Sequence, residues 1–280
     1  MSIKTVLCVL NTSQDGGELK TAIDLAKRAE AHLMVLVLGI APPAPSSPYG
    51  VVSSDIWVRE NETGRGDAQR RAEKIEAQLA KAGVSATVSA QFVEFSSIST
   101  ISARHARYAD ITLVWPASEQ FESFQRAVMD GALFESGRSV LLLGNGGGNV
   151  TFPECRRAVI AWDASVEASK AVRDAIPILA GAETVDAVLV DPEPSLGGHG
   201  QEPGADLGAY LSRHAVEVTI HRVPREGHGV ADIINRFATD RDADLVVMGG
   251  YAHSRLRQRI FGGTTTDMMK NIRQPILMAH

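Results

Sequence analysis

Short apolar runs rich in β-branched residues alternate along the chain with longer segments whose apolar residues recur at helical spacing. In the first half, residues 5–10 and 33–38 have the first pattern. Between them lies a predicted helix with one apolar face, formed by Ala22, Leu25, Ala26 and Ala29. The second half has a matching face, formed by Ala171, Ala175, Ile178 and Leu179. Strands that alternate with helices predict parallel strands joined by helical crossovers, and hence an α/β fold whose sheet is covered on both faces.

This pattern occurs twice. When Asn11, which follows the run 5–10, is placed on Asp163, which follows the run 157–162, the pattern continues without a gap over residues 19–31 with 171–183 and 33–38 with 185–190. After a loop of different length the match resumes, with residues 109–114 on 243–248. Residues 144–149 are rich in glycine and predict a linker. We therefore expect two domains, residues 1–146 and 150–280.

The two halves differ in their middle segments. The first contains a long predicted helix, about residues 55–82. The second has a Gly/Pro-rich loop at 191–204, followed by a short helix near 205–215. Open α/β sheets bind ligands beyond the carboxyl ends of their strands. The residues that directly follow such strands, Asn11, Asp163, Trp115 and Gly249, are therefore the first candidates for a site.

Composition narrows the function classes. The 280 residues are 44% hydrophobic and 22% charged, as in ordinary globular proteins. The net charge of −5 and an aromatic content of 5% argue against nucleic acid or an anionic membrane as partner. The sequence has no apolar run of membrane-spanning length and no signal-peptide pattern, so a cytoplasmic location is expected. Cys8 and Cys155 are too few for a zinc site and are expected to be buried.

A glycine-rich segment follows the predicted fourth strand of the second half. Two glycine pairs, Gly249-Gly250 and Gly262-Gly263, precede a helix expected from about Thr265. Glycines allow backbone N–H groups to approach an anion closely, the helix start adds further donors, and Thr264 or Thr265 offers a hydroxyl. The same residues also fit a tight strand-to-helix turn with threonine caps, and spacing alone leaves both interpretations open.

Other candidate chemistry is sparse. The histidines are scattered without the spacing of a metal site, so no metal is expected. His253 with Arg255, Arg257 and Arg259 forms a basic run that either attracts phosphates or is a solvated surface. The sequence contains neither a catalytic triad nor paired carboxylates with a defined role, so no catalytic residue is expected.

Four segments of the second half follow one another in a defined order: residues 158–165 (AVIAWDAS), 244–249 (DLVVMG), 253–257 with 261–263, and 274–278. In this order they resemble the first strand and its turn, the fourth strand, the stretch before the last helix and the closing strand of the universal stress protein family. The whole chain resembles a tandem member of that family. The resemblance implies a Rossmann-like sheet of five mostly parallel strands, ordered 3-2-1-4-5, in each half. The closing strands, 140–143 and 276–278, would pair within the chain to form a pseudo-dimer.

The resemblance also implies ATP or AMP, with magnesium, as a ligand of the second half. Members that bind ATP carry a glycine, two residues, a glycine, nine residues, and a glycine followed by Ser or Thr. Gly249 and Gly262 match the first and third glycines, Ala252 replaces the second, and Gly263 stands where the hydroxyl residue belongs. These departures predict weak binding. The expected nucleotide-binding residues are Ala161, Trp162, Asp163 at the sugar or base, Val190 at the base, and Met248, Gly249, Gly262, Gly263, Thr264 and Thr265.

The first half departs further from the family pattern. Asn11 replaces the acid, Trp115-Pro116 replaces the glycine pair, and Arg126 and Ala127 fall near the later glycines. Because tryptophan fills space and proline lacks an N–H donor, we expect no nucleotide in this half.

Three functions remain. The first is a stress-response protein that binds an adenine nucleotide weakly and changes its interactions with a protein partner, whose identity the sequence does not reveal. The second is a family member without nucleotide that acts only through protein contacts. The third is a slow nucleotide hydrolase. Association of two chains into a homodimer is compatible with all three.

Overall fold

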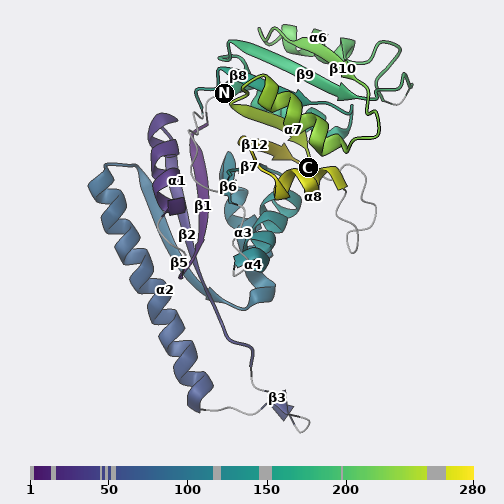
Figure 1. Ribbon diagram of the computed structural model, residues 1–280. Helices are drawn as coiled ribbons and strands as arrows, with labels where there is room; N and C mark the ends of the chain where they lie inside the picture. The colour runs from purple at the N-terminus through teal and green to yellow at the C-terminus, as the bar shows by residue number, and fades with distance from the viewer. Residues whose placement is uncertain are drawn as a thin grey trace. The chain divides into compact units, whose positions relative to one another are not determined.

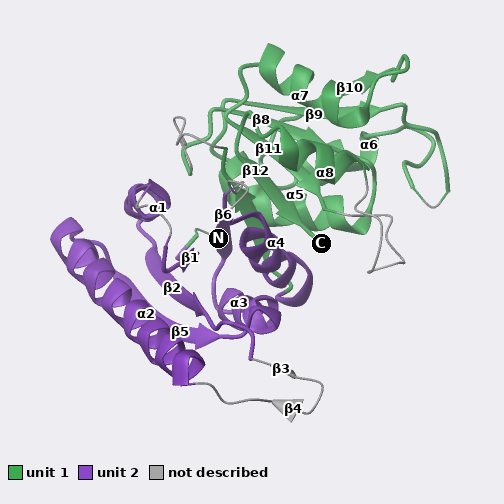
Figure 2. Ribbon diagram, turned by 60° about the horizontal axis from the view of Figure 1, so that its bottom comes forward, with its two compact units in different colours: residues 1–3, 137–280 green, residues 4–136 purple. Residues whose placement is uncertain are grey.

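The computed structural model describes residues 3–13, 17–44, 46–47, 50–51, 55–115, 121–144, 153–196, 198–250 and 263–280. The chain divides into two compact units (Figure 2). We call residues 4–136 the N-terminal unit, and residues 1–3 with 137–280 the C-terminal unit. All but Gly144 of the predicted linker lies outside the described residues, and the predicted domain boundaries stay a prediction.

The N-terminal unit contains a sheet of four parallel strands in the order β5-β2-β1-β6. Its elements are β1 (Thr5–Asn11), α1 (Gly17–Arg28), β2 (His32–Ile40), the short β3 (Ser46–Ser47) and β4 (Gly50–Val51), α2 (Asp55–Ala82), β5 (Ala86–Val93), α3 (Ile98–Ala106), β6 (Ile111–Val114) and α4 (Glu122–Asp130). A 3₁₀ turn (Phe95–Ser97) precedes α3, and a π-helical turn (Gly131–Glu135) extends α4.

Apolar periodicity explains these elements. Every residue of β1 from Val6 to Leu10 is buried, as expected for a central strand covered on both faces. The predicted face of α1 is buried at Ala22, Leu25 and Ala26, whereas Ala29 lies just beyond the end of the helix and is half-buried. The long α2 lies along β2 and β5 (Figure 2) and buries only its second half, from Ala68 onward.

The C-terminal unit contains five parallel strands in the order β10-β9-β8-β11-β12. Its elements are β7 (Ser139–Leu142), β8 (Arg157–Ala161), α5 (Val166–Leu179), β9 (Thr184–Val190), α6 (Ala205–Ser212), β10 (Thr219–Val223), α7 (Val230–Asp240), β11 (Leu245–Gly249), α8 (Gly263–Lys270) and β12 (Ile276–Ala279). In chain order of the half these strands stand 3-2-1-4-5, as predicted. Helix α5 packs on β11 and β12. Helix α8 packs against α7 (Figure 1).

The closing strand of the first half, β7, belongs to the C-terminal unit. It pairs antiparallel with β12, with Val140 opposite Met278 and Leu142 opposite Ile276. The predicted pairing of the two closing strands is therefore confirmed. Residues 1–146 thus contribute the five expected sheet strands β1, β2, β5, β6 and β7. The N-terminal unit contains the first four of them, because the apolar β7 is buried against β12.

The duplication is visible in matching hydrogen bonds at the start of both sheets. Asp110, just before β6, accepts from the main-chain N–H groups of Lys4 and Thr5 at 2.7 and 2.9 Å. Asp244, just before β11, accepts from the N–H groups of Arg156 and Arg157 at 3.0 and 2.9 Å. In each half, one carboxylate thus fixes the start of the first strand beside the start of the fourth.

Candidate functional site

The candidate site lies where β8, β9 and β11 end side by side. Since these strands are parallel neighbours, their carboxyl ends form one edge of the sheet. The chain runs from β8 toward β10 on one side and later from β11 to β12 on the other, so its direction switches between β8 and β11. Asp163 follows one of these two strands and Gly249 ends the other. Ligands of open α/β sheets bind at such switch points.

The turn after β8 is fixed by two side chains. Oδ1 of Asp163 accepts from the main-chain N–H of Ser165 at 3.0 Å, and Ser165 Oγ accepts from the N–H of Ala168 at 3.0 Å. Ser165 therefore caps the start of α5, which satisfies one of the N–H groups that a helix start leaves unpaired. Asp163 is exposed, so its carboxylate faces solvent at the strand edge.

The N-terminal unit contains the same turn with a different acceptor. There, Asn11 Oδ1 accepts from the N–H of Ser13 at 3.0 Å. Asn11 is buried, with 6% of its surface exposed. The turn itself therefore needs only a side-chain oxygen at this position, and the negative charge and exposure of Asp163 are particular to the second half.

Gly249 is explained by packing. A Cβ atom at this position would lie 2.6 Å from the main-chain nitrogen of Ala168 and 2.9 Å from the main-chain carbon of Glu167. Because any side chain would collide with the first turn of α5, glycine is required for the end of β11 to approach that helix.

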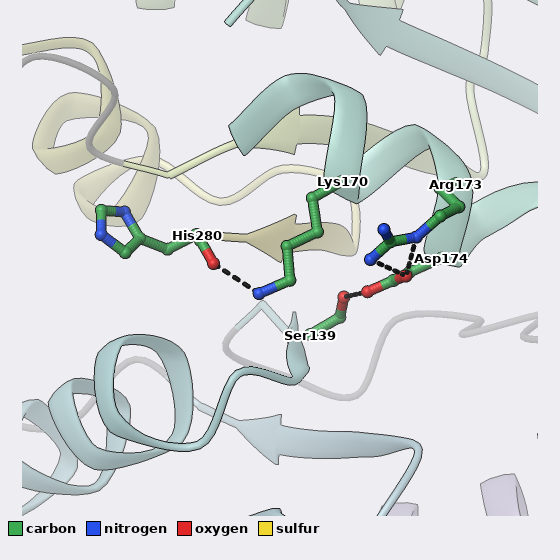
Figure 3. Close-up of polar contacts among 5 residues, drawn as sticks. All are labelled: Ser139, Lys170, Arg173, Asp174 and His280. Carbon is green, nitrogen blue, oxygen red and sulfur yellow. Dashed lines mark hydrogen bonds and ion pairs between the residues drawn. The ribbon is translucent and has the colours of Figure 1, made fainter. Parts of the chain in front are cut away.

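Gly250, the next residue, has both main-chain groups engaged. Its N–H donates to Ala279 O at 2.8 Å, and its carbonyl oxygen lies 2.9 Å from Nδ1 of His280. Lys170 Nζ in turn donates to the main-chain oxygen of His280 at 2.6 Å (Figure 3).

The remaining predicted site residues differ in accessibility. Ala161 and Met248, paired across β8 and β11, are buried, so they can offer a ligand only main-chain groups. Trp162 is half-buried and donates its main-chain N–H to Val188 O. Val190 is half-buried at the end of β9.

At the start of α8, accessibility decreases along the chain. Gly263 is exposed, Thr264 is half-buried, and Thr265 is buried. Thr264 therefore has the more accessible of the two predicted hydroxyls. Gly262 lies outside the described residues, as do Ala252, His253, Arg255, Arg257 and Arg259. The structure thus brings Ala161, Trp162, Asp163, Val190, Met248 and Gly249 to one sheet edge, and it describes Gly263, Thr264 and Thr265 as the start of α8.

Comparison with known proteins agrees with this architecture. Residues 154–280 match the model of the Universal stress protein family. The second half of the chain is a universal stress protein domain, which confirms for these residues the resemblance seen in the sequence.

Solved structures with the same fold span the full chain. A universal stress protein from Archaeoglobus fulgidus DSM 4304 is similar with a TM-score of 0.67 at 16% identity, covering 98% of this chain and 95% of that one. A protein from Pseudomonas aeruginosa UCBPP-PA14, provisionally assigned to the universal stress proteins, has a TM-score of 0.59 at 16% identity, with 98% and 92% covered. A functionally unknown protein from Pseudomonas aeruginosa PAO1 has a TM-score of 0.58 at 15% identity and the same coverage. The tandem arrangement therefore fits the fold of these proteins. No curated protein sequence matches the chain.

The first half differs from the second at the sheet edge that corresponds to the candidate site. Trp115, which follows β6 as Gly249 ends β11, is buried with 8% of its surface exposed. Pro116 lies outside the described residues. Arg126 is exposed and forms an ion pair with Glu122 on α4. The absence of nucleotide from this half stays a prediction.

Both thiols are buried and free of disulfides. Burial, with a smaller contribution from the Asp244 carboxylate, raises the pKa of the Cys155 thiol to about 12. Burial also raises the pKa of Cys8 well above its usual range. Both thiols therefore stay protonated at neutral pH, which fits the prediction of buried apolar side chains.

Within the described ranges, no group of three or more His, Cys, Asp or Glu side chains is arranged to hold a metal ion. No helix in the same ranges combines the length and apolar character that crossing a membrane requires.

The sequence did not predict the polar contacts that α5 makes with its neighbours (Figure 3). In these contacts, Lys170 of α5 binds His280, and Asp174 of α5 binds Ser139. Lys170 and His280 are 110 positions apart, and only the fold brings them together. One signal was available for Ser165. It follows Asp163 by the same spacing as Ser13 follows Asn11, which is typical of a duplicated turn.

Proposed function

We propose that the universal stress protein domain binds an adenine nucleotide weakly at the edge where β8, β9 and β11 end. Nucleotide binding would change the contacts of the protein with a protein partner during the cytoplasmic response to stress. The observation that carries this proposal is the position of Asp163 and Gly249 on either side of the switch between β8 and β11.

Each part of the edge has a role in this proposal. The exposed Asp163 carboxylate retains accepting capacity beyond its bond to Ser165, and it would accept from a ribose hydroxyl or a base amino group. Main-chain groups near Val190 and Trp162 would line the base, with Ala161 and Met248 as the buried floor beneath. The start of α8, at Gly263 and Thr264, would face the phosphates, because unpaired N–H groups and the helix dipole favour an anion there. Magnesium would accompany the phosphates.

The test is calorimetric titration of the full-length protein with ATP and with AMP, each in the presence of magnesium. Gly263→Val adds bulk at the proposed phosphate position, where, among the described residues, a Cβ would meet only Asp267 Oδ2 at 3.9 Å. Gly17→Val is the matched control, since Gly17 also begins a helix and a Cβ there meets no described atom within 4 Å. We expect Gly263→Val to weaken ATP binding at least about tenfold through loss of main-chain contacts to phosphate, and Gly17→Val to leave it unchanged.

Asp163→Asn provides a second variant. Asn11 makes the equivalent turn in the first half, so the substitution should preserve the fold. We expect it to weaken nucleotide binding about five- to twentyfold, because a charge-assisted hydrogen bond becomes a neutral one. Absence of binding by the unmodified protein would contradict the proposal and favour action through protein contacts alone. Phosphate release that Gly263→Val abolishes would instead favour a slow hydrolase.

A further inference from the structure

His280 connects the end of β12 to the end of β11, and Lys170 connects it to α5. His280 Nδ1 lies 2.9 Å from the carbonyl oxygen of Gly250. Because a carbonyl oxygen only accepts hydrogen bonds, Nδ1 carries the proton in this contact. Ala279 accepts the Gly250 N–H at 2.8 Å. Two consecutive residues at the end of β12 therefore engage both main-chain groups of Gly250.

Lys170 extends this contact to α5. Its Nζ donates to the main-chain oxygen of His280 at 2.6 Å, and the lysine lies in the second turn of the helix that Ser165 caps (Figure 3). A hydrogen bond from an ammonium group is stronger than one between neutral groups. Lys170 thus anchors residue 280 to α5, the helix that follows the Asp163 turn.

Gly250, whose N–H and carbonyl groups are both hydrogen-bonded in this way, would otherwise be free to rotate about its backbone bonds. Gly249 and Gly250 are consecutive glycines, the residue type with the widest choice of backbone conformations. Gly249 is fixed by its close approach to Ala168, and Gly250 is fixed by Ala279 and His280. These contacts set the orientation of the peptide groups at the end of β11 before any ligand arrives, which lowers the entropy lost on binding.

We infer that His280, held by Lys170, is a positioning residue that presets the main chain at Gly249–Gly250 for an anionic ligand. The inference rests on the proposed function, since the ligand is the adenine nucleotide bound at this sheet edge. The end of β12 would therefore raise the affinity for the nucleotide without contacting it.

The test compares His280→Ala, His280→Asn, Lys170→Ala and the control His214→Ala in the full-length protein. His214 is exposed at the end of α6, where its ring contacts Tyr210. Asparagine is the conservative variant because its side-chain amide can donate to Gly250 O as Nδ1 does. Two quantities are measured well below the unfolding temperature of each variant. They are the hydrogen-exchange rate of the Gly250 amide without nucleotide, and the dissociation constant for magnesium-ATP.

We expect His280→Ala to accelerate Gly250 exchange about tenfold and to weaken ATP binding about five- to twentyfold, as for the loss of one hydrogen bond. His280→Asn should restore most of both effects, Lys170→Ala should show a smaller loss in both, and His214→Ala should show none. A purely structural role would lower the unfolding temperature and leave the dissociation constant unchanged.

If the unmodified protein binds ATP and His280→Ala binds it equally well, the inference is overturned and the proposed function stands. An Asn variant as weak as the Ala variant would also overturn it. If the unmodified protein binds no ATP, the proposed function fails and the inference with it.

Discussion

Asp163 and Asn11 make the same turn, yet only Asp163 is exposed and charged. The sequence predicted this difference because the two residues align in the duplicated pattern. It did not predict that the turn itself is preserved, since an asparagine oxygen accepts the Ser13 N–H as well as a carboxylate accepts the Ser165 N–H. A site residue can thus change its chemistry while the local backbone stays the same.

Gly249 shows where residue-level prediction was incomplete. The sequence offered two interpretations of the glycine pair, a phosphate contact or a tight turn. Neither included the close approach of β11 to Glu167 and Ala168, which lie more than 80 positions earlier in the chain. Spacing within one segment carries no information about such distant backbone contacts.

We expect Gly249→Ala to destabilise the protein with or without nucleotide. Its Cβ would lie 2.6 Å from Ala168 N, and overpacking against backbone costs about 1–3 kcal/mol. Gly208→Ala is the control in the same half, because a Cβ on α6 at this position meets only Val218 at 4.0 Å. The measurement is the unfolding temperature by calorimetry. Equal unfolding temperatures for the two variants would show that β11 does not need glycine for this packing.

At the scale of elements, apolar periodicity predicted the strands and the buried helix faces. In α5, the predicted positions Ala171, Ala175, Ile178 and Leu179 are all buried. The π-helical turn after α4 was not predicted. It lies where Gly131 packs so closely on α3 that a Cβ would lie 2.1 Å from Ser99 O. Helix–helix contact of this kind depends on the tertiary fold and leaves no periodic signal.

Strand β7 shows how one element joins the two halves of the sequence. Beyond its ladder with β12, its buried Ser139 donates to Asp174 Oδ2 on α5 at 2.7 Å (Figure 3). Asp174 also pairs with Arg173, whose side chain is 61% exposed. The buried contact should therefore matter more than the ion pair on the same carboxylate.

We expect Ser139→Ala to cost about 1–2 kcal/mol, the range for a buried hydrogen bond to a charged group. This corresponds to a fall in unfolding temperature of about 2–8 °C for a domain of this size. Arg173→Ala, which removes the exposed partner of the same carboxylate, should change that temperature by less than about 1 °C. Differential scanning calorimetry measures the unfolding temperature of both variants. An equal fall for the two would contradict the expectation that the buried hydrogen bond to Asp174 matters more than its exposed ion pair.

At the scale of the whole molecule, the sequence predicted a tandem of two related halves, and the family model matches the second of them, at residues 154–280. The sequence also predicted that only the second half retains a nucleotide site. The buried Trp115 and Asn11 at the corresponding edge of the first half are in keeping with that hypothesis. In a nucleotide-binding experiment, the first half of the chain can therefore serve as an internal control for the second.

Backbone amide chemical shifts of the isotope-labelled full-length protein, recorded during titration with magnesium-ATP, test the central claim most directly. The account predicts that saturable shifts concentrate at residues 161–165, 190, 248–250 and 263–265, while residues 11–13 and Trp115 stay unchanged. Shifts centred on residues 11–13, or no change at millimolar ATP, would contradict it.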